Sequence, residues 1–331
     1  MDTVDKQRRH LMGIGAAAAA LAALPPAVRA GGDWPARPIT FISPWAVGGT
    51  GDMLARPLCT AAGRHLGQTI VYTNRPGASG MIGCKAVATA APDGYTVGEI
   101  PITVGRLALL GMTDIKPLED YAYIARTSGQ NLGLAVMAGS PWQSLPALLE
   151  DAARRPGQIT FGFSGLGGSN HIAVERVLRA AGVQLTAIPF KGGNEALQAL
   201  YGGHLDMLAD SSSWAPGVKA GKLRLLATMG EQRSKMFADT PTLKDLGYDV
   251  ADDGPRAVAA PAGTPEPIVR KLREAFRVAV ASREFTEACA QIDAPPMYLD
   301  GPDFRQYLVD TMAQERKLIE QLDMKTLLQV S

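Results

Sequence analysis

Short β-forming runs alternate with runs of helical spacing along almost the whole chain, and this alternation is the feature that most limits how it can fold. Ile39–Ser43 has the composition of a strand, and so has Thr69–Thr73. Between them, Asp52–Leu66 places Leu54 and Leu58 one helical turn apart and ends before a glycine. Strand, glycine turn, helix and strand in succession are typical of parallel α/β units. We therefore predict an α/β protein with two doubly wound sheets.

The same alternation continues toward the C-terminus. Further strands are expected at Tyr95–Ile100, Leu132–Ala138, Ile159–Ser164, Gln184–Phe190, Leu205–Ala209, Leu223–Met229, Ala257–Ala260 and Met297–Leu299. Further helices are expected at Met81–Ala91, Leu145–Arg154, Asn170–Ala181, Glu195–Tyr201, Trp214–Ala220, Pro265–Ala281, Glu284–Gln291 and Pro302–Leu322. Ser144 is placed to cap one of these helices, and Gly67 to end an earlier one. The pattern does not show which strands share a sheet.

Length and charge narrow the classes of function. The chain has 331 residues, which suits roughly two domains of about 150 residues each. Hydrophobic residues make up 46% of it, enough for a large core. The formal net charge is only +1, and no Lys/Arg cluster is present. Proteins that bind the phosphate backbone usually carry a basic excess, so we expect no nucleic-acid partner.

The first thirty residues have the composition of a secretory leader. A positive start that includes Arg8 and Arg9 precedes an alanine-rich apolar run, Leu11–Leu24, and small residues around Ala30 offer a cleavage point. The run is shorter than the roughly 20 residues of a membrane span. The paired arginine fits a twin-arginine signal as well as the general export route. We expect residues 1–30 to be removed and the mature chain to be periplasmic.

Three cysteines, Cys59, Cys84 and Cys289, follow the leader. Three is an odd number, so at most one pair can form, and their wide spacing gives no zinc signature. We predict that they are buried small apolar residues. A disulfide between Cys59 and Cys84 remains the alternative.

Four glycine-rich loops each lie between a predicted strand and a predicted helix: Gly48–Asp52, Pro76–Gly80, Ser164–Ser169 and Lys191–Asn194. In open α/β sheets such loops lie at the carboxyl ends of strands, where ligands bind. Glycine lets the backbone approach a ligand, and a helix N-terminus offers free N–H groups and a partial positive charge. These features predict a site for an anion such as a carboxylate, built from peptide dipoles.

Side chains in these loops have two interpretations. The hydroxyls of Thr50, Ser79, Ser164 and Ser169 are candidate donors to the anion, and Lys191 is a candidate charge. Alternatively, the loops are plain connectors, the hydroxyls cap helices and Lys191 is a solvated surface cation. Trp45 and Trp214 either favour an aromatic or apolar acid or fill packing gaps.

Signals for catalysis are weak. The loop serines do not form a Gly-x-Ser-x-Gly elbow, and no phosphate-binding Gly-x-x-x-x-Gly-Lys motif is present. Outside the leader, the histidines are His65, His171 and His204, and no two have metal-ligand spacing. His171 begins a helix, where it is a candidate polar contact or, less favoured, a base. Asp210 is expected to order a loop. We predict neither a metal nor a cofactor.

Several short motifs follow one another in a fixed order. They are Trp34–Ile39, Pro44–Asp52 with Ala55-Arg56, Asn74–Gly80, Ala91–Thr96, Ser164–His171, Lys191–Gly193, Gly202–Asp206, Ala220–Arg224, Thr240–Leu243 and Ala260–Pro265. This set resembles the Bug-type (TctC-like) substrate-binding proteins of tripartite tricarboxylate transporters. The resemblance covers essentially the whole chain after the leader.

The resemblance implies a type II periplasmic-binding-protein fold, in which two lobes joined by a two-segment hinge hold a ligand between them. One lobe is expected to comprise residues 31–131 and 257–331, and the other residues 132–256. The family binds di- or tricarboxylates, acidic amino acids or aromatic acids. Carried over by position, the ligand-binding residues are Gly48, Gly49, Thr50, Asp52, Ser79, Ser164, Ser169, His171, Lys191, Gly192 and Asp210.

The sequence therefore predicts a monomeric solute-binding protein, not an enzyme. It captures a small carboxylate between its lobes, and its partners are the permease subunits of a membrane transporter. Two alternatives stay open at this point. One is a ligand-sensing module that delivers its closed form to a signalling receptor. The other, less favoured, is a hydrolase that uses a loop serine with His171.

Overall fold

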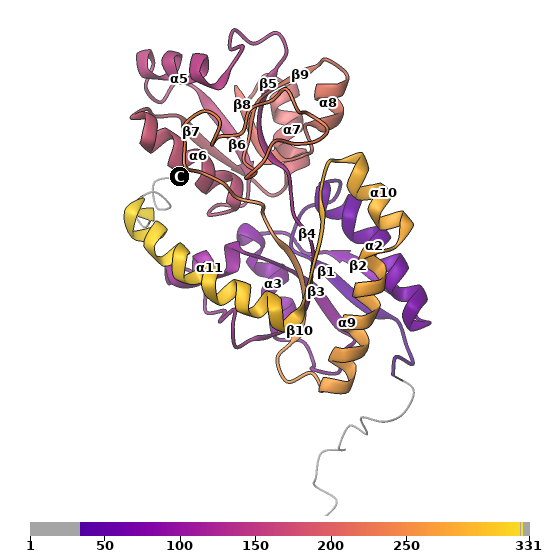
Figure 1. Ribbon diagram of the computed structural model, residues 1–331. Helices are drawn as coiled ribbons and strands as arrows, with labels where there is room; N and C mark the ends of the chain where they lie inside the picture. Colours follow the sequence, from indigo (N-terminus) through magenta and orange to yellow (C-terminus); the bar gives the residue numbers. More distant parts are fainter. Residues whose placement is uncertain (1–33, 325, 327–331) are drawn as a thin grey trace, which may run out of the picture. The chain divides into compact units, whose positions relative to one another are not determined.

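The computed structural model describes residues 34–324 and residue 326 (Figure 1). Both β-sheets belong to the compact unit that begins at Pro35. The predicted leader, residues 1–30, lies outside the described residues. Within them, no helix combines the length and apolar character needed to cross a bilayer.

A six-stranded sheet is the centre of what we call lobe 1. Its strand order is β11-β4-β10-β3-β1-β2. The bounds are β1 Ile39–Ser43, β2 Ile70–Asn74, β3 Thr96–Pro101, β4 Tyr121–Ser128, β10 Arg256–Pro261 and β11 Pro296–Asp300. Strand β1 is parallel to β2 and β3, whereas β10 runs antiparallel between β3 and β4. The sheet is therefore mixed, and two of its strands arrive from the C-terminal part of the chain.

Helices cover both faces of this sheet. One group is α2 Thr50–Leu66, α9 Glu266–Val280 and α10 Arg283–Gln291, and the other is α3 Met81–Ala88, α4 Thr103–Leu109 and α11 Gly301–Gln321, with the short 3-10 helix η1 Ala78–Gly80 before α3. Phe41 and Ile42, adjacent on β1, point to opposite faces because side chains alternate along a strand. Phe41 contacts Phe276 of α9, with ring centroids 6.4 Å apart. Ile42 packs in a cluster with Val87 of α3.

A five-stranded sheet is the centre of lobe 2, in the order β7-β6-β8-β5-β9. Its strands are β5 Leu132–Met137, β6 Thr160–Ser164, β7 Thr186–Phe190, β8 Met207–Ser211 and β9 Leu223–Thr228, and its helices are α5 Leu145–Arg154, α6 Ser169–Ala181, α7 Gly193–Tyr201 and α8 Ala215–Lys219. Alternation along β5 again separates two cores. Leu134 packs with residues of α5 and α6, and Ala135 packs with residues of α7 and α8.

Two segments carry the chain between the lobes. Residues 129–131 connect β4 to β5, and residues 229–255 connect β9 to β10. The segments are hydrogen-bonded to each other. The backbone N–H of Gln130 donates to the Asp253 carbonyl and its side-chain amide donates to the Gly254 carbonyl, each at 2.6 Å. The connection between the lobes is thus a pair of hydrogen-bonded segments rather than a single linker.

The C-terminal helix α11 also reaches lobe 2. Ile319 and Leu322 near its end share an apolar cluster with Leu107 and Leu110 around α4. Ile172 of α6, in lobe 2, belongs to the same cluster. The lobes therefore contact each other through apolar side chains as well as through the connecting segments.

Local signals in the sequence are confirmed at helix ends. The Ser144 hydroxyl accepts from the Ala147 backbone N–H at 3.4 Å, and Gly67 ends α2 with a left-handed φ of 69°. The pattern missed β4 and α4. Asp210 lies in β8, and its carboxyl accepts from the Ser213 hydroxyl in the segment that follows, as expected of a residue that orders a loop. Strand β8 runs two residues past its apolar run, because Asp210 and Ser211 pair with β5 there.

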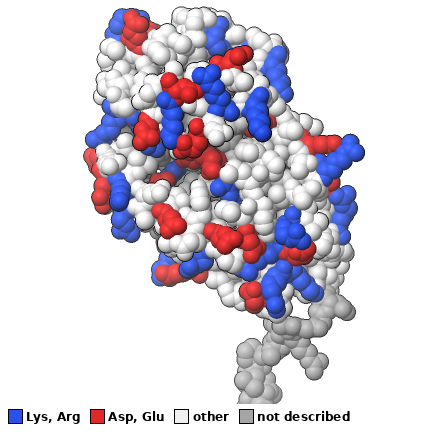
Figure 2. All heavy atoms as spheres, viewed as in Figure 1, with Lys and Arg blue, Asp and Glu red and all other residues white. Residues whose placement is uncertain are grey.

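All three cysteines are buried and none is paired, as the composition predicted. Basic and acidic side chains are interspersed over the face of the molecule that Figure 2 shows, in keeping with the small net charge.

Candidate ligand-binding site

Three helices begin at one pocket between the lobes. They are α2, α6 and α7, whose N-cap residues are Gly49, Gly168 and Gly192. Because each N-cap is a glycine, none of the three contributes a side-chain cap hydrogen bond within the described part of the chain. Helix N-termini leave backbone N–H groups free and carry a partial positive charge. Their meeting at one cavity creates a site that favours an anion.

Close packing explains the glycines at Gly168, Gly192 and Gly193. A Cβ added to Gly168 would lie 2.9 Å from the Gly165 carbonyl oxygen. A Cβ on Gly192 would lie 3.0 Å from the Cβ of Ala46, which belongs to the opposite lobe. A Cβ on Gly193, the first residue of α7, would lie 2.0 Å from Oδ2 of Asp210. Any larger residue would obstruct the loops that meet around the pocket.

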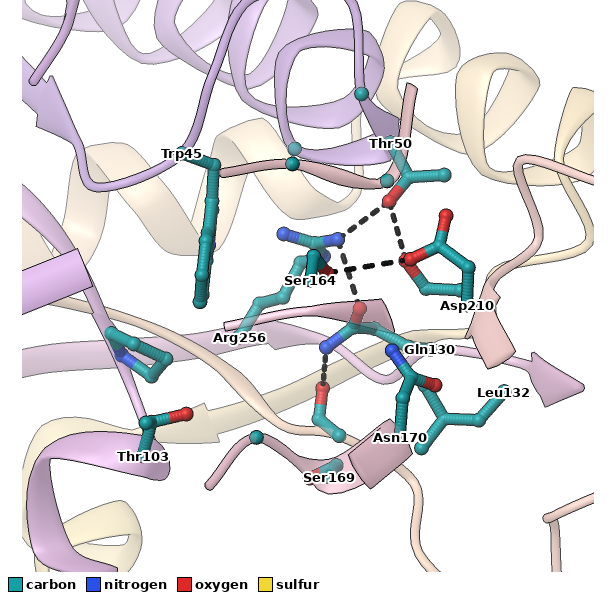
Figure 3. Close-up of a pocket in the computed structure, with 18 of the residues that line it drawn as sticks. Trp45, Thr50, Thr103, Gln130, Leu132, Ser164, Ser169, Asn170, Asp210 and Arg256 are labelled. Atoms are coloured by element: carbon teal, nitrogen blue, oxygen red, sulfur yellow. Dashed lines mark hydrogen bonds between the residues drawn. The ribbon is translucent and has the colours of Figure 1, made fainter. Parts of the chain in front are cut away.

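A buried arginine in the pocket was missed by sequence reasoning. Arg256 is 6% exposed, and its Nη1 donates to Oε1 of Glu99 at 2.8 Å. Nη2 donates to the Thr50 hydroxyl at 2.8 Å and to Oε1 of Gln130 at 3.0 Å (Figure 3). The site therefore contains a formal cation, and the expectation of peptide dipoles alone is incomplete. One indication of a buried charge pair is present in the sequence. Glu99 is a lone glutamate inside the predicted strand Tyr95–Ile100.

Thr50 links the lobes directly. Its hydroxyl lies 2.7 Å from the Ser211 hydroxyl of β8. The same hydroxyl accepts a hydrogen bond from Arg256. The two groups belong to α2 and β8, which are built on different sheets. The Thr50 hydroxyl is thus already engaged by protein groups on both sides of the pocket.

Asp210 is a buried acid in the same pocket. Its carboxyl accepts from the Ser213 hydroxyl and, at 3.4 Å, from the Ser164 hydroxyl. The indole Nε1 of Trp214 donates to its backbone carbonyl at 3.0 Å. Burial raises the pKa of the Asp210 carboxyl, and the hydrogen bonds and Arg256 only partly offset this.

Asp210→Asn is expected to gain stability relative to the natural protein as pH rises. Between the ordinary carboxyl pKa of 3.8 and the raised value, folded Asp210 keeps a proton that the unfolded chain has released. The free energy of unfolding of the natural protein therefore falls as pH rises through this window. Asparagine does not titrate, so the difference is measured from urea midpoints of both proteins between about pH 4 and pH 8.

Asp52→Asn is the matched control with the opposite sign. Burial raises the Asp52 pKa, but hydrogen bonds from Tyr72, Asn74 and Gly48 outweigh it, and the net pKa is lowered. The natural protein therefore gains stability over this variant as pH rises from the lowered pKa through the ordinary value of 3.8, so this control is followed below about pH 4 as well. A constant stability difference for Asp210→Asn over the whole range contradicts the raised pKa.

The pocket gathers six of the residues proposed from the sequence. These are Gly49, Thr50, Ser164, Ser169, Gly192 and Asp210. The other five do not line it: Gly48, Asp52, Ser79, His171 and Lys191. Residues of the lining that the sequence did not single out include Glu99, Thr103, Gln130, Asn170, Ser211 and Arg256.

Asp52 and His171 support the loops from behind. The Asp52 carboxylate accepts from the Gly48 backbone N–H at 2.9 Å and from the Tyr72 hydroxyl at 2.6 Å. His171 is 1% exposed and stacks on Phe163, with ring centroids 4.2 Å apart. Its Nδ1 accepts from the Gly167 backbone N–H at 3.2 Å. Both side chains fix loop backbone that leads into the pocket.

The remaining candidates from the sequence are Lys191, Ser79 and the two tryptophans. Lys191 is exposed, and Ser79 lies in η1 with a left-handed φ of 54°. Trp214 is fully buried in the core of lobe 2. Trp45 lines the pocket and donates from Nε1 to Oε1 of Glu99 at 3.1 Å. Of the two tryptophans, only Trp45 is placed to meet a ligand.

A second buried arginine holds the lobes together outside the pocket. Arg106 of α4 is 3% exposed, and its Nε and Nη2 donate to the two carboxylate oxygens of Glu315 of α11, at 2.8 and 2.6 Å. Nη2 also donates to Asp252 of the long connecting segment at 3.1 Å. Nη1 lies 3.3 Å from the Ser169 hydroxyl and 3.4 Å from the Gly167 carbonyl, both in lobe 2. One side chain thus joins four segments.

Two α/β lobes, two connecting segments and an anion-favouring pocket between the lobes define a solute-binding protein of the two-lobe class. The profile of the tripartite tricarboxylate transporter family receptor, TctC, matches residues 54–324. The chain belongs to this family, as the resemblance predicted. The family consists of solute-binding receptors and not enzymes.

A curated relative from Cupriavidus necator, described as a UPF0065 protein in the gbd 5' region, is 38% identical over 321 residues. The match covers 96% of this chain and 98% of the relative. The periplasmic binding protein BugD has a similar structure, with a TM-score of 0.84 and 26% identity, covering 88% of this chain and 99% of BugD. These similarities confirm the two-lobe periplasmic-binding-protein fold.

Two Rhodopseudomonas palustris structures are also similar and contain ligands. A protein solved with adipate has a TM-score of 0.83 and 28% identity, over 88% of this chain and 98% of that protein. MatC, solved with malate, has a TM-score of 0.80 and 25% identity, over 86% of this chain and all (100%) of MatC.

The geometry also disfavours a serine hydrolase. His171 Nδ1 accepts from Gly167, and its Nε2 faces Glu175 at 3.6 Å. Ser164 and Ser169 have Asp210 and Arg106 as their partners. A hydroxyl nucleophile needs a base within hydrogen-bond reach, and among the described residues neither serine hydrogen-bonds to His171.

Proposed function

We propose that this protein captures a small carboxylate between its two lobes and presents it to a membrane transporter. The observation that carries the proposal is the meeting of the uncapped N-termini of α2, α6 and α7 at one pocket. Backbone N–H groups and helix dipoles stabilise a carboxylate without requiring a free cation. The adipate and malate of the two similar structures support a carboxylate as the ligand class. The cavity, about 60 Å³, favours a small acid.

Capture proceeds, in this proposal, by closure of the lobes about the two connecting segments. The lobes then comprise residues 31–131 with 257–331 and residues 132–256, with hinges near residues 132 and 255. A ligand that contacts both lobes binds the closed form better and shifts the population toward it. Gln130 supports this role, because it hydrogen-bonds the second connecting segment and also Arg256 in the pocket.

The proposed location is the periplasm, after removal of residues 1–30, and the proposed partners are permease subunits of a tripartite tricarboxylate transporter. The composition of the leader and the family support both. A sensing role, in which the closed form is delivered to a signalling receptor, remains the alternative. Deletion of the genes for such permease subunits in the host distinguishes the two roles, since only transport requires those subunits.

Carboxylates are expected to raise the melting temperature of the protein, whereas their amides and methyl esters are not. A ligand that binds only the folded state stabilises it by mass action, by about 2.7 kcal/mol at a concentration 100 times its Kd. The measurement is a thermal-shift screen against short-chain, dicarboxylic and aromatic acids, each paired with its amide. Hits dominated by sugars or cationic amines would overturn the proposed function.

A further inference from the structure

The described lining of the pocket contains three ionisable side chains, and not all of their charges are free to bind a ligand. Among the described residues of the lining, Arg256 is the one cation, and Glu99 and Asp210 are the two acids. Glu99 and Arg256 are buried together, with side chains 5% and 8% exposed. A ligand therefore meets a cation that already has a carboxylate partner within the protein.

Glu99 is held in that role from both sides. Its Oε1 accepts from Arg256 Nη1 at 2.8 Å and from Trp45 Nε1 at 3.1 Å. The two strands fix the pair, because β3 and β10 are antiparallel neighbours in which Glu99 is opposite Val258. Gly51 leaves room for the pair against α2, since a Cβ there would lie 3.4 Å from Arg256 Nη1 and 3.8 Å from Glu99 Oε2.

The rest of the guanidinium is mostly occupied as well. Both hydrogens of Nη2 have acceptors, the Thr50 hydroxyl and Gln130 Oε1. Among the described residues, Arg256 Nε has no hydrogen-bond partner although it is buried. The arginine is thus oriented and neutralised, yet it retains the capacity to bind a carboxylate if Glu99 releases it.

We propose that Glu99 is a specificity-determining residue that makes the pocket accept one ligand carboxylate and reject a second. The helix N-termini serve the first carboxylate, and this inference rests on the proposed function for that part. A second carboxylate brought into the pocket would find Arg256 already paired and the Glu99 carboxylate close by. Removing its hydration without a free cation is unfavourable, and like charges add repulsion. The protein thus favours a monocarboxylate over the dicarboxylate of equal length, unlike the two similar proteins solved with adipate and malate.

Isothermal titration calorimetry with butanoate and succinate tests this inference, because the two acids share a four-carbon chain and differ in one carboxylate. The natural protein is expected to bind butanoate at least about tenfold more tightly than succinate. In Glu99→Gln, the Kd ratio is expected to move toward succinate by about tenfold or more, because the second carboxylate then replaces the missing partner of Arg256. Equal or tighter binding of succinate by the natural protein, or an unchanged ratio in the variant, overturns the inference.

Two further variants serve as controls, one for the role of the Arg256 guanidinium and one for the loss of a buried acid outside the pocket. Glu99→Gln combined with Arg256→Gln has no buried charge in the pair, so it also covers the case in which the single variant fails to fold. It is expected to show no gain for succinate, and a gain equal to that of Glu99→Gln would contradict the role of the freed guanidinium. Glu315→Gln, a buried acid that pairs with Arg106 outside the pocket, is expected to leave the ratio unchanged. If the natural protein binds no carboxylate at all, the proposed function fails; if only the ratios fail, Glu99 alone is misassigned.

Discussion

Arg106→Met is expected to lower the free energy of unfolding by about 3 to 5 kcal/mol, the range found when one partner of a buried ion pair is removed. The methionine fills much of the volume but leaves the Glu315 carboxylate buried without the two N–H groups that now bind it. Asp252 and the Ser169 hydroxyl lose a partner at the same time. Urea unfolding at neutral pH, followed by circular dichroism, measures the effect.

Two control variants separate charge burial from a general sensitivity to arginine loss. Arg277→Met removes a surface ion pair with Glu274 that is half exposed, and its urea midpoint is expected to match that of the natural protein. Arg106→Met with Glu315→Met is expected to recover part of the loss, since apolar residues of similar volume replace both charges. If Arg106→Met unfolds at the natural midpoint, the buried network does not stabilise the fold.

Gly193→Ala is expected to weaken carboxylate binding by about 10- to 100-fold, which corresponds to about 1.4 to 2.7 kcal/mol. The added Cβ would lie 2.0 Å from Oδ2 and 2.6 Å from Oδ1 of Asp210. The Asp210 carboxyl or the first turn of α7 must therefore move, and both line the pocket. Overpacking of this kind also costs stability, typically about 1 to 3 kcal/mol. Calorimetric titration with the acid that the thermal-shift screen identifies measures the affinity.

Gly139→Ala is the matched control, because a Cβ there meets no atom within 4 Å and its backbone is not left-handed. Its affinity and stability are expected to equal those of the natural protein. Adding Asp210→Ala to Gly193→Ala removes the clashing carboxyl, so the stability lost in the single variant should return. An affinity for Gly193→Ala equal to that of Gly139→Ala shows that α7 does not contribute to the site.

The glycine loops show how far sequence reasoning reaches here. Glycine before an apolar helix, as at Gly168 and Gly192, predicts where a helix begins and that its N–H groups are free. The alternation of strands and helices predicts the fold class. That the three N-termini share one pocket does not follow from any local pattern, because it depends on how two sheets face each other.

The charged residues of the site were missed because their partners are remote in sequence. Arg256 and Glu99 are separated by 157 positions, and Arg106 and Glu315 by 209. In the sequence each is an isolated charge, and isolated charges are usually solvated. Lys191 is the opposite case, since its place in a glycine loop suggested a ligand contact, whereas the structure places it exposed and outside the pocket lining, as for a solvated surface cation. Burial decides between these cases, and burial of a long side chain is a property of the tertiary fold.

Because the end of α11 reaches lobe 2 outside the pocket, overall affinity and preference among ligands can be changed by substitutions at different places. In the proposed closure, the apolar cluster that Ile319 and Leu322 share with Ile172 biases the balance between lobe arrangements, although none of the three lines the pocket. The apparent dissociation constant depends on the fraction of molecules in the binding-competent arrangement, whichever acid is bound. Substitutions at the end of α11 therefore change the apparent dissociation constant for every acid by the same factor. The preference among acids is still set by the loops that line the pocket.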